Sequence, residues 1–193
     1  IKEQIAAYPH RCIRLVQGPG LGKGAACRAG FDQAQGDVLM ILDADMTVMP
    51  EDLPAFLQAT CQRKGEFING SRMVYPLAHD AMRPLNILGN KFFAGLFSYL
   101  LEQPIKDTLC GTKVFLRRDW PRLRAARDYF GHLDRWGDFD LLFGAAKCSL
   151  KIVELPVHYV ERVAGQTKMT RRLRNAWIML RMCWVGFVKL KLH

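Results

Sequence analysis

A run of apolar residues at positions 38–42 ends abruptly in two carboxylates, Asp43 and Asp45. A run this short and this apolar predicts a β-strand buried on both faces, as in a parallel sheet covered by helices. In open α/β sheets, ligands bind outside the carboxyl ends of the strands. Mg²⁺ takes one or two protein carboxylates and completes its coordination with water and substrate phosphates. Asp43 and Asp45 are therefore a candidate metal site for chemistry on a phosphate-bearing substrate, although Asp-rich turns also follow many strands.

Strand and helix patterns alternate along the chain. Strands are expected at residues 12–17, 37–42 and 66–71, and helices at 23–35 and 51–63 between them. This βαβαβ order predicts right-handed crossovers and a mainly parallel sheet. Later elements are expected at 85–101 (helix), 111–116 (strand), 138–148 (helix) and 151–160 (strand). Without a repeat or a linker, the pattern predicts one α/β domain with a C-terminal tail.

Charge and cysteine content limit the classes of binding partner and the cellular compartment that we expect. The 193 residues include 28 basic and 18 acidic side chains, a net charge of +10, which suits phosphates, nucleic acid or an anionic membrane surface. The basic residues follow no nucleic-acid-binding motif, so no nucleic acid partner is expected. The six cysteines are scattered without a Cys-x-x-Cys pair, as expected for buried thiols in a reducing compartment.

A glycine-rich turn at residues 18–22 precedes Lys23. It lacks the first glycine and the hydroxyl residue of a P-loop, and it also lacks the third glycine of the dinucleotide-binding fingerprint. Two interpretations are left: a turn that needs positive φ angles, and a turn that presents Lys23 and a helix N-terminus to an anion. Lys23 is therefore a candidate contact for a phosphate-bearing donor.

Several ordered motifs within residues 12–168 resemble family 2 glycosyltransferases, and most closely the polyprenyl-phosphate sugar synthases of the dolichol-phosphate mannose synthase type. They are KGAACRAG at 23–30, GD at 36–37, DAD at 43–45, PEDL at 50–53, NGSR at 69–72, DTLCGTK at 107–113, ELPV at 154–157 and RVAGQTK at 162–168. The resemblance implies a GT-A (Rossmann-like) three-layer sandwich. It also implies an inverting transfer of a sugar from a nucleotide-sugar donor to a polyprenyl-phosphate acceptor, with Mg²⁺ or Mn²⁺.

The same resemblance assigns roles to individual residues. Asp43 and Asp45 would contact the donor nucleotide and the metal ion that neutralises the departing diphosphate. The charges suited to donor diphosphate or acceptor phosphate are Arg72, Lys113, Arg162 and Lys168. Lys113 stands where the family pattern has Arg, so it keeps the charge but loses the bidentate fork.

Three roles are open for Asp138, which lies near the position of a Glu-Asp pair that supplies the general base in related inverting enzymes. Gly137 stands in the Glu position of that pair. A hydroxyl acceptor needs a base to take its proton, whereas a phosphate acceptor is already an anion. Asp138 is therefore a base, a positioning group or the N-cap of the helix that follows, and cap or positioning is slightly favoured.

Residues 169–193 are expected to form a basic amphipathic helix beside a glycosyltransferase domain at 1–168. At helical spacing one stripe is basic (Arg171, Arg174, Arg181, Lys189), and the opposite side is apolar (Leu173, Trp177, Leu180, Trp184, Phe187). This pattern predicts an interfacial helix at the cytoplasmic face of a membrane. A core helix and the approach to a transmembrane segment are the alternatives.

The family's opening strands, with a Pro-x-(Tyr/Phe)-Asn-Glu type motif, have no counterpart in this sequence. Ile1 is expected to lie in the helix that follows them, so we expect the sheet to lack its first strands and the chain alone to be inactive. Two further hypotheses are a transferase that uses a lipid or saccharide hydroxyl, with Asp138 as base, and a non-catalytic membrane-associated scaffold.

Overall fold

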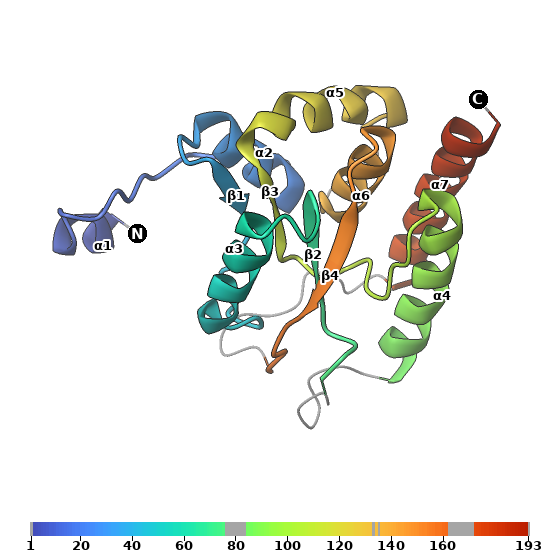
Figure 1. The fold of residues 1–193 in the computed structure, drawn as a ribbon, viewed down its shortest axis with the longest axis horizontal. Helices are drawn as coiled ribbons and strands as arrows, with labels where there is room; N and C mark the ends of the chain where they lie inside the picture. Colours follow the sequence, from blue (N-terminus) through green and yellow to red (C-terminus); the bar gives the residue numbers. More distant parts are fainter. Residues whose placement is uncertain (1, 76–83, 133, 135, 162–171, 193) are drawn as a thin grey trace.

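The computed structural model describes residues 2–75, 84–132, 134, 136–161 and 172–192. A four-stranded sheet runs through the molecule, with helices on both of its faces (Figure 1). Its strands are β1 (Val38–Met40), β2 (Phe67–Ser71), β3 (Lys113–Leu116) and β4 (Ile152–Pro156), in the order β1-β3-β2-β4. The layered α/β architecture predicted from the sequence is confirmed.

Three of the four strands run in the same direction. β2 and β4 pair in parallel, whereas β3 lies between β1 and β2 and is antiparallel to both. β1, β2 and β4 share one direction, as expected for a mainly parallel sheet, but two of the three strand pairings are antiparallel because β3 lies between β1 and β2. The position of β3 was not foreseen, because the apolar pattern of a buried strand carries no information about its direction.

Helices surround the sheet and account for most of the predicted elements. They are α1 (Lys2–Ala7), α2 (Lys23–Gln33), α3 (Leu53–Cys61), α4 (Pro84–Leu101), α5 (Trp120–Phe130), α6 (Asp138–Lys147) and α7 (Arg172–Lys191), with short 3₁₀ turns at Pro50–Asp52 and Arg117–Asp119. The strand predicted at 12–17 does not form, because no strand among the described residues pairs with it. Helix α5 was not predicted from the sequence, although its buried Trp120, Leu123 and Ala126 recur at helical spacing.

The two faces of the sheet enclose two separate cores, because alternate residues of a strand point to opposite sides. Phe67 on β2 and Phe115 on β3 stack on each other at 5.7 Å in the larger core, which α2, α4, α5, α6 and α7 cover. Ile68 and Val114 point the other way into a smaller core that includes Phe56 of α3. β2 is buried along its whole length, as a central strand should be.

Helix α7 packs on the domain instead of standing apart from it. Met179, Met182 and Cys183 join the larger core, and Gly186 lies directly against the ring of Phe143 on α6. Trp177 stays 69% exposed, so the apolar side of the helix divides into a buried strip and an exposed strip. Among the described residues, no helix is both long and apolar enough to cross a membrane.

Candidate active site at the carboxyl end of β1

The loop that follows β1 carries Asp43 and Asp45. The backbone N–H of Ile41 still donates to the carbonyl of Lys113 at 3.0 Å, so the ladder with β3 holds the chain up to the start of this loop. The Asp45 carboxylate accepts hydrogen bonds from the backbone N–H and the hydroxyl of Thr47 at 3.2 and 2.9 Å. The two carboxylates therefore lie at the strand end predicted from the sequence, in a loop that local hydrogen bonds fix.

Lys23 reaches this loop from the first turn of α2. The residues before it adopt left-handed backbone angles at Gly20 (φ 72°) and Gly22 (φ 100°), so the turn does need its glycines. The Lys23 ammonium lies 2.9 Å from the Asp43 carboxylate and 3.6 Å from that of Asp138. The structure thus brings together Lys23, Asp43 and Asp138, which the sequence analysis had named separately.

Lys113 lies on the inner side of Asp138 and is fully buried. Its ammonium donates to the side-chain oxygen of Asn69 at 3.1 Å and to the backbone carbonyl of Cys110 at 2.5 Å. The same ammonium is 3.4 Å from Asp138 Oδ1. The Lys113 ammonium therefore points into the protein interior toward Asp138. Because it has no contact with solvent, a phosphate ligand could not touch it without displacing protein atoms.

These four groups form a chain of alternating charge, Lys113–Asp138–Lys23–Asp43, in which the pKa values of the two middle groups are shifted. Burial works to lower the pKa of the Lys23 ammonium, but the carboxylates of Asp138 and Asp43 outweigh it and raise that pKa above its usual value. Burial also raises the pKa of Asp138, while Lys113 and Lys23 oppose the rise. A carboxylate with a raised pKa is a stronger base than an exposed one.

Close backbone contacts hold the two helix starts together. A Cβ at Gly24 in α2 would lie 2.8 Å from the backbone nitrogen of Gly137, and Gly137 itself has φ 87°. A Glu at position 137 would meet both obstacles, since its Cβ would lie 2.8 Å from the Gly24 Cα at a positive φ. Gly111 approaches the site equally closely, since its Cβ would lie 2.1 Å from Asp43 Oδ2.

Asp134, not Asp138, caps helix α6. One oxygen of the buried Asp134 carboxylate accepts the backbone N–H groups of Phe139 and Asp140 at 2.8 and 3.0 Å. Asp138 makes no such capping bond, so its interpretation as the N-cap is corrected. The sequence analysis missed Asp134, although an Asp just ahead of an apolar helix is a recognisable capping signal.

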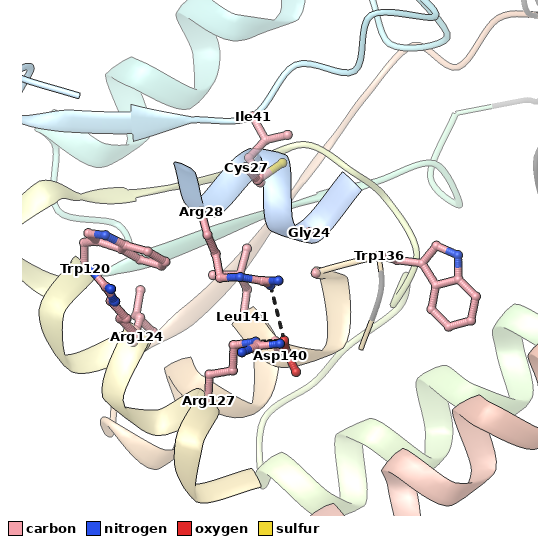
Figure 2. A pocket seen from close by; sticks show the side chains of 12 residues that line it. Gly24, Cys27, Arg28, Ile41, Trp120, Arg124, Arg127, Trp136, Asp140 and Leu141 are labelled. Carbon is pink, nitrogen blue, oxygen red and sulfur yellow. Dashed lines mark hydrogen bonds and ion pairs between the residues drawn. The ribbon is translucent and has the colours of Figure 1, made fainter. Parts of the chain in front are cut away.

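A pocket between α2, α5 and α6 borders this site on the side of Gly24 and Gly137 (Figure 2). Within it Arg127 and Arg28 both face the Asp140 carboxylate, at 2.9 and 3.6 Å. Burial, followed by the neighbouring Asp134 charge, raises the pKa of Asp140 to about 7, against the pull of the two guanidinium groups. The pocket wall therefore contains a carboxylate that titrates near neutral pH.

Arg72 follows β2 and is engaged by Asp107. Its Nε and Nη2 atoms donate to the two oxygens of the fully buried Asp107 carboxylate, at 2.6 and 2.7 Å. The guanidinium also lies over the ring of Tyr159, 5.2 Å from its centre. Burial would raise the pKa of Asp107, but Arg72 outweighs it and holds that pKa below its usual value. Asp107 was quoted within a motif but given no role from the sequence.

Arg162 and Lys168 lie outside the described residues. Within the described part of the chain, no group of three or more His, Cys, Asp and Glu side chains is placed to hold a metal ion. The donor set at this loop is the two carboxylates of Asp43 and Asp45. That set suits Mg²⁺, which fills its other positions with water and phosphate oxygens.

Comparison with known proteins gives a consistent picture. The model of the family "Glycosyl transferase family 2" matches residues 1–124. A dolichyl-phosphate beta-glucosyltransferase from Trichomonas vaginalis is 33% identical over 84% of this chain and 51% of its own length. An undecaprenyl-phosphate mannosyltransferase from Micrococcus luteus is 30% identical over 77% of this chain and 61% of its own length. A dolichyl-phosphate hexose transferase from Haloferax volcanii is 29% identical over 81% of this chain and 64% of its own length. The chain thus spans between about half and two thirds of the length of these relatives.

Proposed function

Because the chain belongs to glycosyl transferase family 2, we propose that the protein moves a sugar, with inversion, from a nucleotide-sugar donor to a polyprenyl-phosphate acceptor. The names of its relatives support this acceptor, since they act on dolichyl phosphate or undecaprenyl phosphate. The observation that carries the proposal is the meeting of Lys23 with the Asp43 loop at the carboxyl end of β1. Ligands of open α/β sheets bind at such strand ends.

In the proposed reaction Asp43 and Asp45 hold Mg²⁺ or Mn²⁺, which supplies Lewis-acid stabilisation of the departing diphosphate when bound. The Lys23 ammonium adds positive charge beside these carboxylates. Arg72, Arg162 and Lys168 are the proposed phosphate contacts. Lys113 is left out of this set, because its buried ammonium already faces Asp138, Asn69 and the Cys110 carbonyl.

Asp138 bears on the choice of acceptor. Its carboxylate is almost wholly buried and lies between the ammonium groups of Lys113 and Lys23. A phosphate acceptor requires no base, so this enclosed position supports a phosphate acceptor and a positioning role for Asp138. A hydroxyl acceptor would instead require Asp138 to take its proton.

We also propose that the protein works at the cytoplasmic face of a membrane, with α4 and α7 toward the lipid. The two helices lie side by side (Figure 1). Each exposes an apolar stripe at helical spacing: Leu85, Leu88, Phe92 and Tyr99 on α4, and Trp177, Leu180 and Trp184 on α7. Exposed Arg174 and Arg181 add the positive charge that attracts anionic headgroups. The six cysteines are all free, which suits the reducing cytoplasm.

The catalytic proposal is tested by a transfer assay with the complete natural protein, Mg²⁺ or Mn²⁺, polyprenyl phosphate and a panel of nucleotide sugars. We expect a lipid-linked sugar product, and we expect Asp45→Asn to lower kcat/KM by about 100-fold or more. The control Asp128→Asn, at an exposed position of α5, should leave the rate unchanged. Absence of transfer, or an Asp45→Asn variant as active as wild type, contradicts the proposal.

Asp138→Asn separates the acceptor classes in the same assay. With a phosphate acceptor we expect the rate to stay within about ten-fold of wild type. Loss of a general base for a hydroxyl acceptor would lower the rate by about 100-fold or more.

The membrane proposal is tested with vesicles: Trp184→Ser should weaken sedimentation of the protein with anionic vesicles. The control Leu57→Ser, at an exposed leucine of α3, should not.

A further inference from the structure

The Lys23 ammonium occupies the place beside Asp43 that a bound cation would take. It donates to Asp43 Oδ2 at 2.9 Å, and the Asp43 side chain is 33% exposed. A divalent ion and a lysine ammonium compete for the same carboxylate oxygen, so both cannot hold it fully. Gly111 closes the other side, since a Cβ there would lie 2.5 Å from Lys23 Nζ.

A second acceptor for this ammonium lies next to the first. Asp138 Oδ1 is 3.6 Å from Lys23 Nζ and 3.4 Å from Lys113 Nζ, but among the described residues neither ammonium donates a hydrogen bond to it. A buried carboxylate oxygen without a hydrogen bond is costly, and a lysine on its flexible stem can supply one by a small movement. The geometry therefore offers Lys23 two alternative partners.

We propose that Lys23 is a built-in competitor for the divalent cation at Asp43, and that cation binding transfers its ammonium from Asp43 to Asp138. This inference rests on the proposed function, because the divalent cation at Asp43 is part of that proposal. The ammonium keeps Asp43 paired in the absence of the cation. Once displaced, it supplies the hydrogen bond that Asp138 Oδ1 lacks.

Lys23 is the member of the charge chain that is free to move. Lys113 is fully buried and bound to Asn69 and to the Cys110 carbonyl, and Asp138 is fixed at the start of α6 by the contact between Gly24 and Gly137. The Lys23 side chain is 29% exposed, in contrast to 7% for Asp138 and none for Lys113. Transfer therefore requires movement of one long side chain and no shift of the helices.

The test measures Mn²⁺ binding to the purified protein by electron paramagnetic resonance, without donor or acceptor. Lys23→Met removes the competitor, and we expect Mn²⁺ to bind about ten-fold more tightly, the scale of one charge-assisted hydrogen bond. Arg28→Met is the matched control: it removes one positive charge from the same helix, but Arg28 faces Asp140. We expect it to change the affinity by less than about three-fold.

Asp138→Asn should act in the opposite direction and keeps the proposal testable if Lys23→Met fails to fold. It removes the charge that receives the displaced ammonium, so Lys23 stays on Asp43 and Mn²⁺ should bind several-fold more weakly. The control Asp140→Asn removes one carboxylate from the same helix without a contact to Lys23. Its effect should be smaller than that of Asp138→Asn.

The outcomes separate this inference from the proposed function. Opposite effects of Lys23→Met and Asp138→Asn support competition, even if no sugar transfer is detected. Weaker Mn²⁺ binding by Lys23→Met, an equal gain in Arg28→Met, or no Mn²⁺ binding by either wild type or Lys23→Met overturns it. Asp43→Asn added to Lys23→Met should remove the gain, and persistence of the gain also counts against the proposal.

Discussion

Two ion-pair clusters lie close to the carboxyl ends of the strands, and they are built differently. In one, Arg72 meets Asp107 with two short parallel hydrogen bonds, and backbone N–H groups of Arg72 and Leu109 donate to the same carboxylate at 3.0 Å each. In the other, Lys23 joins Asp43 and Asp138 through one hydrogen bond and one longer contact. The first cluster is saturated with hydrogen bonds. The second is open, in the sense that Asp138 Oδ1 lacks a hydrogen bond among the described residues and that Lys23 and Asp43 are partly exposed.

The difference follows from side-chain chemistry and burial. A guanidinium is a planar fork that fits a carboxylate in one arrangement, whereas an ammonium is a point charge on a flexible stem. Asp107 is fully buried, so its partner cannot leave without exposing an unpaired charge to the interior. Lys23 and Asp43 keep contact with water. We infer that the Arg72–Asp107 pair keeps its arrangement whether or not a phosphate is bound, and that the Lys23 cluster is the one able to rearrange for a ligand.

The largest expected effect comes from breaking the saturated cluster. Asp107→Ala leaves the Arg72 guanidinium buried without its partner, and the free energy of unfolding should fall by about 3–5 kcal/mol. Urea unfolding followed by circular dichroism measures the loss. Asp37→Ala breaks an exposed pair with Arg117 and serves as the control, with an expected loss below about 1 kcal/mol. Equal losses in the two variants would remove the distinction between the clusters.

The next largest effect is expected at the close backbone contact between Gly24 and Gly137, which holds the open cluster together. Gly137→Ala introduces a Cβ 2.8 Å from the Gly24 Cα at a residue with φ 87°, so the helix starts must separate or strain. We expect a loss of about 2–3 kcal/mol in the free energy of unfolding. Gly30→Ala, in α2 with no atom near the new Cβ, should be neutral or stabilising by up to about 1 kcal/mol. A neutral Gly137→Ala would show that the contact does not hold the site.

A smaller effect concerns pH, through Asp140 in the neighbouring pocket. Its pKa is raised to about 7 in the folded protein, from about 3.9 for an exposed aspartate. Between these values the folded state keeps a proton that the unfolded state has lost, so this group makes stability fall as pH rises toward 7. Asp140→Asn should flatten that fall, by about 1.4 kcal/mol per pH unit at most. Urea unfolding at pH 5 and pH 7 measures it, and an unchanged slope contradicts the shift.

Local pattern was enough to predict that Asp43 and Asp45 lie at the end of a buried strand. The apolar run before Asp43 marked a buried strand, and the rule that ligands bind at strand ends placed the two carboxylates correctly. The glycine turn brought Lys23 to the same edge. The sequence pattern did not predict which side chains form ion pairs between distant elements. The pairing of Lys113 with Asp138 depends on the antiparallel insertion of β3, which no local signal encodes.

Helix α7 shows a second limit of periodicity. Its sequence predicted an amphipathic helix, and the helix forms. The pattern did not tell which apolar strip turns inward, because Met179 and Met182 are as apolar as Trp177 and Trp184. The choice is made by packing against α4, α5 and α6, where Gly186 allows the close approach of Phe143. Surface and core strips of one helix therefore look alike in sequence.

The smallest expected effect is on the open cluster itself. Lys23→Met removes the pair with Asp43, whose two side chains are 29% and 33% exposed, so water can replace much of that interaction. The buried Asp138 also loses Lys23 but keeps its ion pair with Lys113 at 3.4 Å. We expect the free energy of unfolding to fall by less than about 1 kcal/mol. The control is Lys64→Met, at an exposed turn after α3, which should be neutral. A loss as large as that of Asp107→Ala would mean that Lys23 maintains the fold, and an ammonium with that role would not be free to leave Asp43 for Asp138.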